Sequence, residues 1–172
     1  MVLGFKQYFP WNGEYGKPEP TYFREKIITV AMMQRTPNGG LLPEETPSMP
    51  NIPIPFIPKI HTFREDSHNR WKAGMKVSMV YRGAGYKIID HFNKDIPELD
   101  TIKSIQKIEI KYGKDLGVFK AVIVAVDGRI LDEYERVKLA QNDGFKDSDQ
   151  LFKWFKTDWS GKILHFTDFR YE

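Results

Sequence analysis

Alternating hydrophobic and polar positions predict most of the strands. Successive side chains of a strand point to opposite faces, so a strand with one buried face alternates in character. Residues 102–112 show this pattern, with Ile108, Ile110 and Tyr112 set between charged residues. The same reasoning predicts four more strands, at residues 2–7, 60–64, 76–82 and 162–169. Val118 to Val126 is almost continuously apolar, which predicts a strand buried on both faces.

Hydrophobic side chains recur at helical spacing in three other segments. These predict helices over residues 21–34, 132–141 and 148–157. Each segment begins with a residue suited to N-capping, namely Thr21, Asp132 and Asp147. Helices that interrupt the strands without regular alternation favour an α+β fold over a doubly wound sheet. The mixed patterning of the strands predicts a small mixed β-barrel with flanking helices.

A proline-rich segment at residues 36–58 follows the first predicted helix. Seven of the eleven prolines lie in it, together with Gly39 and Gly40. Proline lacks an N–H and fixes φ, so neither a helix nor a central strand can run through the segment. We interpret it as a long insertion loop. Two hypotheses remain open, a wrap that packs on the body and a lid beside a cleft.

Length and composition limit the classes of protein. The 172 residues suit one domain, which we expect to span 1–172. The chain has no cysteine and four scattered histidines, so we expect neither a metal site nor a cofactor. No apolar run is long enough for a membrane helix and no signal peptide is evident, so we expect a cytoplasmic protein. The 26 basic against 23 acidic residues permit nucleic-acid binding without requiring it.

The most distinctive polar cluster is the run from Lys59 to Asp66. In an extended chain Thr62 and Arg64 share a face, because side chains repeat every two residues. Lys59 falls on the other face and meets Thr62 only if the chain turns first, which Pro58 makes plausible. The alternative is an exposed half-strand carrying a surface lysine and a surface arginine.

A second polar cluster follows the predicted helix at 132–141. Asp143 stands there beside Gly144, which has the character of a glycine that ends a helix. An aspartate in this position is more often a turn residue than a catalytic acid. His165 and Thr167 share a face of the last predicted strand, where we expect a hydrogen-bonded core histidine.

These features occur in an order that resembles the ASCH superfamily, whose barrel is similar to the PUA RNA-binding domain. The matching segments are 3–6, 23–27, 59–64, 71–76, 139–145 and 163–167. Within them, Lys59, Thr62 and Arg64 match the signature Lys-x-x-Thr-x-Arg. The resemblance implies a small mixed barrel with helices around it and a cleft that binds RNA or a nucleotide-like ligand.

The resemblance also implies roles for individual residues. One bacterial branch of the superfamily hydrolyses the amide of N-acetylcytidine with a lysine, a threonine and an acid. Lys59 and Thr62 match that branch, and Asp143 stands where its glutamate is expected. Ligand contacts are expected from His61, Arg64, Arg70 and Trp71. Ile57 and Pro58 depart from the family pattern, which has a glycine two residues before the lysine.

Three functions follow from the sequence. The first is an RNA- or nucleotide-binding domain that holds its ligand in the signature cleft. The second is an amidohydrolase acting on an acylated nucleoside, with a threonine nucleophile, a lysine base whose pKa is lowered by its surroundings and an acidic partner. The third is a scaffold protein whose cleft is vestigial. Whether the chain is an enzyme stays open at this point.

Overall fold

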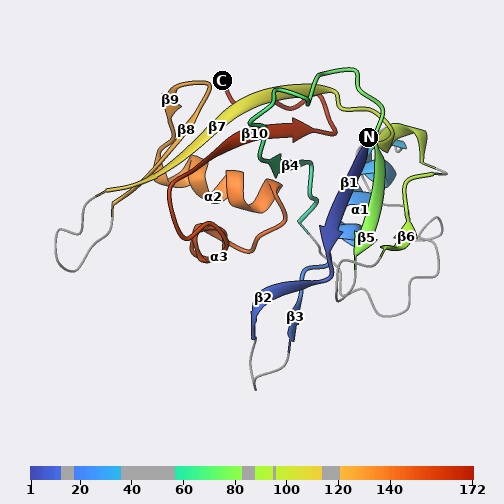
Figure 1. The fold of residues 1–172 in the computed structure, drawn as a ribbon, viewed down its shortest axis with the longest axis horizontal. Coiled ribbons are helices and arrows are strands. Elements are labelled where there is room, and N and C mark those ends of the chain that lie inside the picture. Colours follow the sequence, from blue (N-terminus) through green and yellow to red (C-terminus); the bar gives the residue numbers. More distant parts are fainter. Residues whose placement is uncertain (13–17, 36–56, 83–87, 95, 114–120) are drawn as a thin grey trace.

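The chain adopts a mixed α+β fold, which confirms the predicted class (Figure 1). The computed structural model describes residues 1–12, 18–35, 57–82, 88–94, 96–113 and 121–172. Within these ranges lie three α-helices and three β-sheets. None of the three sheets closes into a barrel within the described ranges, so the expected barrel is not confirmed. Most of the proline-rich segment, 36–56, lies outside the described residues.

The largest sheet has five antiparallel strands in the order β4-β10-β7-β8-β9. These strands span His61–Arg64, Trp159–His165, Ser104–Tyr112, Val122–Val126 and Arg129–Ile130. Strand β7 follows its predicted alternation, because Ile108 and Ile110 are fully buried while Lys107 and Lys111 are exposed. The prediction that 118–126 is buried on both faces is wrong over the described part, β8. Ile123 is 44% exposed there, since only one face of the sheet meets the core.

A second sheet of three strands lies beside the first (Figure 1). Its strands are β1 (Val2–Lys6), β5 (Ser78–Arg82) and β6 (Ile88–His91), and β1 pairs with β5 in parallel. A third pair, β2 (Tyr8–Asn12) with β3 (Pro18–Pro20), projects from the body. A short 3-10 helix, η3 (Pro97–Leu99), precedes β7.

The helices start close to their predicted caps. The first, α1 (Phe23–Arg35), begins two residues after Thr21, whose hydroxyl accepts the Phe23 N–H at 3.4 Å. The second, α2 (Glu133–Asn142), has a complete capping box between Asp132 and Glu135. The box satisfies two of the backbone groups that the first turn leaves unpaired.

The third helix, α3 (Ser148–Trp154), is shorter than predicted. Its cap is confirmed, because the Asp147 carboxylate accepts the Gln150 N–H at 2.8 Å. The helix ends at Trp154 because Phe155 leaves the helical conformation, with φ −98° and ψ 84°. That change turns the Phe155 ring toward Trp159, with centroids 4.7 Å apart. The end of α3 therefore coincides with this aromatic contact.

Candidate functional site

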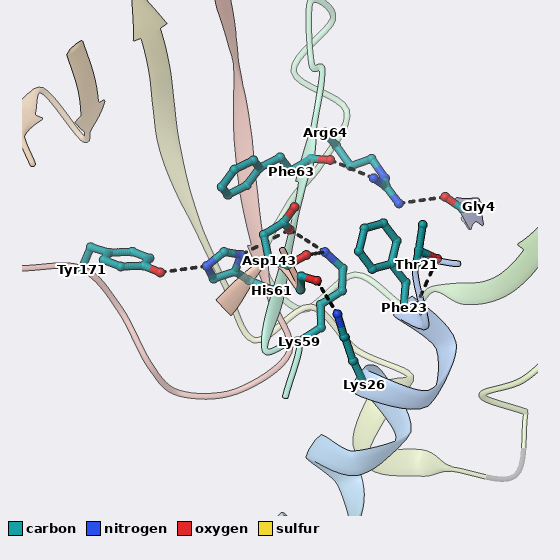
Figure 2. A network of polar contacts seen from close by, with 11 residues as sticks. Gly4, Thr21, Phe23, Lys26, Lys59, His61, Phe63, Arg64, Asp143 and Tyr171 are labelled. Carbon is teal, nitrogen blue, oxygen red and sulfur yellow. Dashed lines mark hydrogen bonds and ion pairs between the residues drawn. The ribbon is translucent and has the colours of Figure 1, made fainter. Parts of the chain in front are cut away.

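The centre of the candidate site is a buried ion pair between Lys59 and Asp143 (Figure 2). The Lys59 Nζ donates to Asp143 Oδ1 at 2.6 Å and also to the Asp143 backbone carbonyl. Lys59 is only 1% exposed, which is rare for lysine unless the charge is paired. The alternative of a surface lysine on an exposed half-strand is therefore wrong.

Backbone hydrogen bonds hold Lys59 outside the strand. The Lys59 N–H donates to the Lys26 carbonyl of α1 at 3.2 Å. The next N–H, of Ile60, donates to the Asn142 carbonyl at the end of α2 at 2.9 Å. Strand β4 begins only at His61, so the alternation of the strand does not fix the direction of the Lys59 side chain. Lys59 and Thr62 consequently line the same pocket.

The turn after α2 presents its carbonyl groups to two lysines. Asp143 is the C-cap of α2, and its N–H donates back to Leu139 and Ala140. The Lys26 ammonium donates to the Gly144 carbonyl at 2.6 Å, while Lys59 donates to the carbonyl of Asp143. Cations stabilise a helix C-terminus because its last carbonyls carry partial negative charge.

Gly144 has to be glycine for two reasons. Its φ is +88°, in the left-handed region, and an added Cβ would lie 3.0 Å from the Phe23 ring and 3.2 Å from the Lys59 side chain. We expect Gly144→Ala to destabilise the fold by about 2–4 kcal/mol, from backbone strain of about 1 kcal/mol plus crowding. Denaturant unfolding of the purified variant measures this.

Gly128→Ala is the matched control for that substitution. Gly128 has nearly the same φ, +87°, but an added Cβ would meet nothing within 4 Å. It therefore reports the backbone strain alone, about 1 kcal/mol. Equal losses of unfolding free energy in the two variants would show that crowding against Phe23 and Lys59 does not require glycine at position 144.

Burial shifts the protonation equilibria of the basic groups at the site. Desolvation lowers the pKa of Lys59 to about 8, with the neighbouring cations Arg64 and Lys26 adding to the shift and Asp143 opposing it. Burial also lowers the pKa of Lys26. The pKa of Arg64 falls to about 10 for the same reason, against the attraction of Asp143. Lys59 and Arg64 both carry charge at neutral pH, and Lys59 loses its proton at a lower pH than Arg64 does.

A pocket of about 150 Å³ opens at this ion pair. The lining residues with polar side chains are Lys6, Lys59, Thr62, Arg64 and Asp143. The last four are predicted site residues, which the fold brings together there. Aromatic rings form much of the wall: Phe5, Phe23, Phe63, Phe145, Trp154 and Phe155. The Lys59 ammonium lies 4.5 Å from the centroid of the Phe23 ring. The Thr62 hydroxyl makes no hydrogen bond to Lys59 or Asp143, all three being described residues.

Arg64 joins the two larger sheets across the pocket. Its guanidinium donates to the Gly4 carbonyl on β1 at 2.9 Å and to the Phe63 carbonyl at 2.8 Å (Figure 2). The guanidinium also lies 5.0 Å from the centroid of the Phe5 ring. These contacts hold a delocalised cation at the pocket, close to an aromatic ring.

His61 lies next to Asp143 but does not line the pocket. Its Nδ1 is 3.5 Å from Asp143 Oδ1, and its Nε2 is 2.9 Å from the Tyr171 hydroxyl. Asn142 donates to the same hydroxyl at 2.9 Å. Burial lowers the pKa of His61, which favours the neutral ring. His61 therefore packs beside Asp143 without a hydrogen bond from Nδ1 among the described residues, and it does not face the pocket.

Arg70 and Trp71 lie in the segment after β4 and do not line the pocket. The Asp66 carboxylate accepts the Arg70 N–H at 2.8 Å. Trp71 is buried in the core, and the Arg70 guanidinium lies 5.7 Å from its ring centroid. The Trp71 ring is thus covered by the protein itself.

His165 is buried as expected but not hydrogen-bonded. Neither of its ring nitrogens has a partner among the described residues. Its ring meets His61 edge to face, with centroids 5.4 Å apart. Burial, His61 and Arg170 lower the pKa of His165 to about 3, so the ring is neutral in the folded protein. The expectation of a satisfied core histidine is wrong in this respect.

Two contributors to the site were missed by sequence reasoning. Tyr171 is near the C-terminus and has no local pattern that marks it, although it anchors His61. Lys26 lies on α1 and was noted only as part of the matching segment 23–27. Their roles depend on three-dimensional contacts, of Lys26 on α1 with the turn after α2 and of Tyr171 with His61 on β4.

Comparisons with known proteins give no relative. The chain matches no family model, no curated protein and no solved structure. Among the described side chains, no group of three or more histidines and acids is placed to hold a metal ion. The helices of the described ranges include none with the length and apolarity needed to span a membrane.

Proposed function

We propose that the chain is an RNA- or nucleotide-binding domain of the ASCH type, which holds a nucleobase in the pocket at Lys59. The observation that carries this proposal is the combination of aromatic walls with the cations Lys59 and Arg64 in one pocket. Aromatic rings stack on bases, and cations contact phosphate or carbonyl oxygens. The bridge from Arg64 to Gly4, which draws the edge of β4 toward β1, supports a barrel-like ASCH architecture.

The size of the pocket limits what enters it. Sites that enclose a whole small-molecule ligand are commonly about 300–1,000 Å³. The pocket here is about 150 Å³, which suits a single planar group. A base is such a group, and its sugar and phosphate then remain at the mouth.

If Arg64 contacts the ligand in the pocket, removing its side chain should lower the affinity for RNA. We expect Arg64→Ala to weaken binding of a fluorescein-labelled short RNA roughly 10- to 100-fold, because it removes one charge-assisted contact. Wild-type binding is expected to weaken as salt rises. Fluorescence polarisation measures both effects, and circular dichroism checks the fold.

Arg70→Ala is the matched control for this loss. Arg70 is an exposed arginine six residues away that lines no part of the pocket. We expect it to leave RNA affinity within about twofold of wild type, since its guanidinium lies over Trp71. Equal losses in both variants, or binding that ignores ionic strength, would contradict the proposal.

A second candidate function is amide hydrolysis of an acylated nucleoside. It is favoured by the presence of Thr62, Lys59 and Asp143 in one pocket and by the lowered pKa of Lys59. Neutral Lys59 would take the proton of the Thr62 hydroxyl as it attacks the amide carbonyl. The amine then leaves with a proton, and water hydrolyses the acyl-threonine ester. Arg64 would stabilise the oxyanion.

This second candidate predicts a clear difference between two substitutions of Thr62. With N-acetylcytidine as substrate, Thr62→Val is expected to abolish release of cytidine, whereas Thr62→Ser keeps part of it because the hydroxyl remains. Turnover in the wild type should rise with pH and level off above about 8, as Lys59 loses its proton. Mass spectrometry follows the product. Undiminished turnover by the valine variant would remove Thr62 from the mechanism.

A further inference from the structure

The mouth of the pocket adjoins two half-buried tryptophans. Trp154 at the end of α3 forms part of the pocket wall. Trp11 on β2 meets it edge to face, with ring centroids 6.2 Å apart and planes at 85°. Phe9 stacks on Trp11 at 4.8 Å and supports it from the core. The aromatic wall therefore continues from the pocket onto the β2–β3 pair.

A lysine ammonium lies over each of these two indole rings. The Lys6 ammonium lies 5.3 Å from the ring centroid of Trp154, and that of Lys153 lies 4.9 Å from the ring centroid of Trp11. Both lysines are exposed, and neither has a carboxylate partner among the described residues. Aromatic rings interleaved with unpaired cations are typical of surfaces that bind single-stranded nucleic acid.

The carboxylate of Glu19, which contacts Trp11, is already engaged. Glu19 accepts the Trp11 indole N–H at 2.7 Å through one oxygen and the Gln150 side-chain amide at 2.8 Å through the other. These bonds fix the orientation of the indole and join β3 to α3. Glu19 thus positions the ring, and both of its carboxylate oxygens already accept a hydrogen bond.

We propose that Trp11, Trp154, Lys6 and Lys153 form a second subsite, so that the ligand is single-stranded RNA and not a free nucleoside. This inference rests on the proposed function. One base enters the pocket, and its neighbour stacks on the tryptophans while the lysines contact the phosphates. An exposed cation–π contact is weak, so each ammonium can leave its ring for a phosphate oxygen. The small pocket, which accepts little more than a base, is consistent with a ligand that continues outside it.

The test compares the affinities of adenosine 5′-monophosphate and a tetra-adenylate RNA by titration calorimetry. For the wild type we expect the tetranucleotide to bind roughly 5- to 150-fold more tightly, the magnitude of one stacked base. Trp11→Leu should remove most of this gain. Lys153→Gln should reduce the gain and lower the salt dependence of log affinity by about 0.7, one phosphate contact. Trp11→Leu should leave the affinity for the mononucleotide unchanged, because a single nucleotide has no second base to stack on Trp11.

Lys138→Gln is the matched control. Lys138 is also an exposed lysine over an aromatic ring, 4.7 Å from the Tyr134 centroid. That ring lies on α2 and, unlike Trp11, makes no ring contact with the pocket residue Trp154. The Lys138→Gln variant should bind the tetranucleotide like the wild type. Mononucleotide binding without a gain for the tetranucleotide, or equal effects of Lys153→Gln and Lys138→Gln, would overturn the subsite and leave the proposed function intact. Failure of both ligands to bind would overturn both.

Discussion

Asp143→Ala is expected to destabilise the fold by about 3–5 kcal/mol, the usual loss when one partner of a buried ion pair is removed. The substitution leaves the Lys59 ammonium buried and without its carboxylate. It also removes the group beside His61 Nδ1. Urea unfolding at pH 7 measures the change, and loss of RNA binding should accompany it.

Two comparisons make this expectation specific. Glu109→Ala removes an exposed ion pair with Lys107, 2.8 Å long, and should leave the unfolding midpoint nearly unchanged. The double variant Lys59→Met with Asp143→Ala should be less destabilised than the sum of the two single variants, because no unpaired charge then remains. Additive losses, or a loss no larger than that of Glu109→Ala, would contradict the buried pair.

Acidification is expected to destabilise the protein through His165. Its pKa is about 3 in the folded protein against an ordinary 6.5, because the ring is buried beside His61. The unfolded chain therefore binds the proton more readily below pH 6.5, and stability is lost as pH falls from 6.5 toward 3. The loss amounts to roughly 4 kcal/mol over that window, at 1.36 kcal/mol for each pKa unit. His61, whose pKa is also lowered, acts in the same direction.

The measurement is the free energy of unfolding between pH 6.5 and 4 for the wild type and His165→Phe. As pH falls, the free energy of unfolding of the wild type should decrease more than that of His165→Phe, because only the wild type has this imidazole. Titration of the carboxylates is common to both proteins and cancels in the comparison. His68→Gln is the control, since His68 is an exposed histidine. Parallel curves for wild type and His165→Phe would show that His165 does not control acid stability.

Local patterns predicted the elements whose residues carry their own signals. Strand β7 has nine residues and a clear alternation, and α2 has a capping box that needs only Asp132 and Glu135. The strands β2, β3, β6 and β9 were not predicted. They have two to five residues each, and Pro10, Pro18 and Pro20 interrupt two of them. Their pairing depends on partners elsewhere in the chain, which periodicity does not report.

The site was predictable in its components but not in its assembly. The spacing of Thr62 and Arg64 placed both on one face, and both line the pocket. The pattern alone favoured a surface position for Lys59, because lysine is seldom buried. Its burial depends on Asp143, 84 positions along the chain, and no local pattern joins the two. The resemblance to ASCH proteins suggested that Lys59 and Asp143 lie close together. The assignment of the chain to that family stays a proposal.

Binding of a base in the pocket is tested most directly by mapping amide chemical shifts in a ¹H–¹⁵N spectrum during titration with adenosine 5′-monophosphate. We predict that the largest changes fall on the pocket backbone at Thr62, Arg64, Asp143 and Phe145 and on the indole of Trp154. The amides of β9, on the far edge of the five-stranded sheet, should not move. No shifts at saturating ligand, or shifts that cluster away from the pocket, would contradict the account.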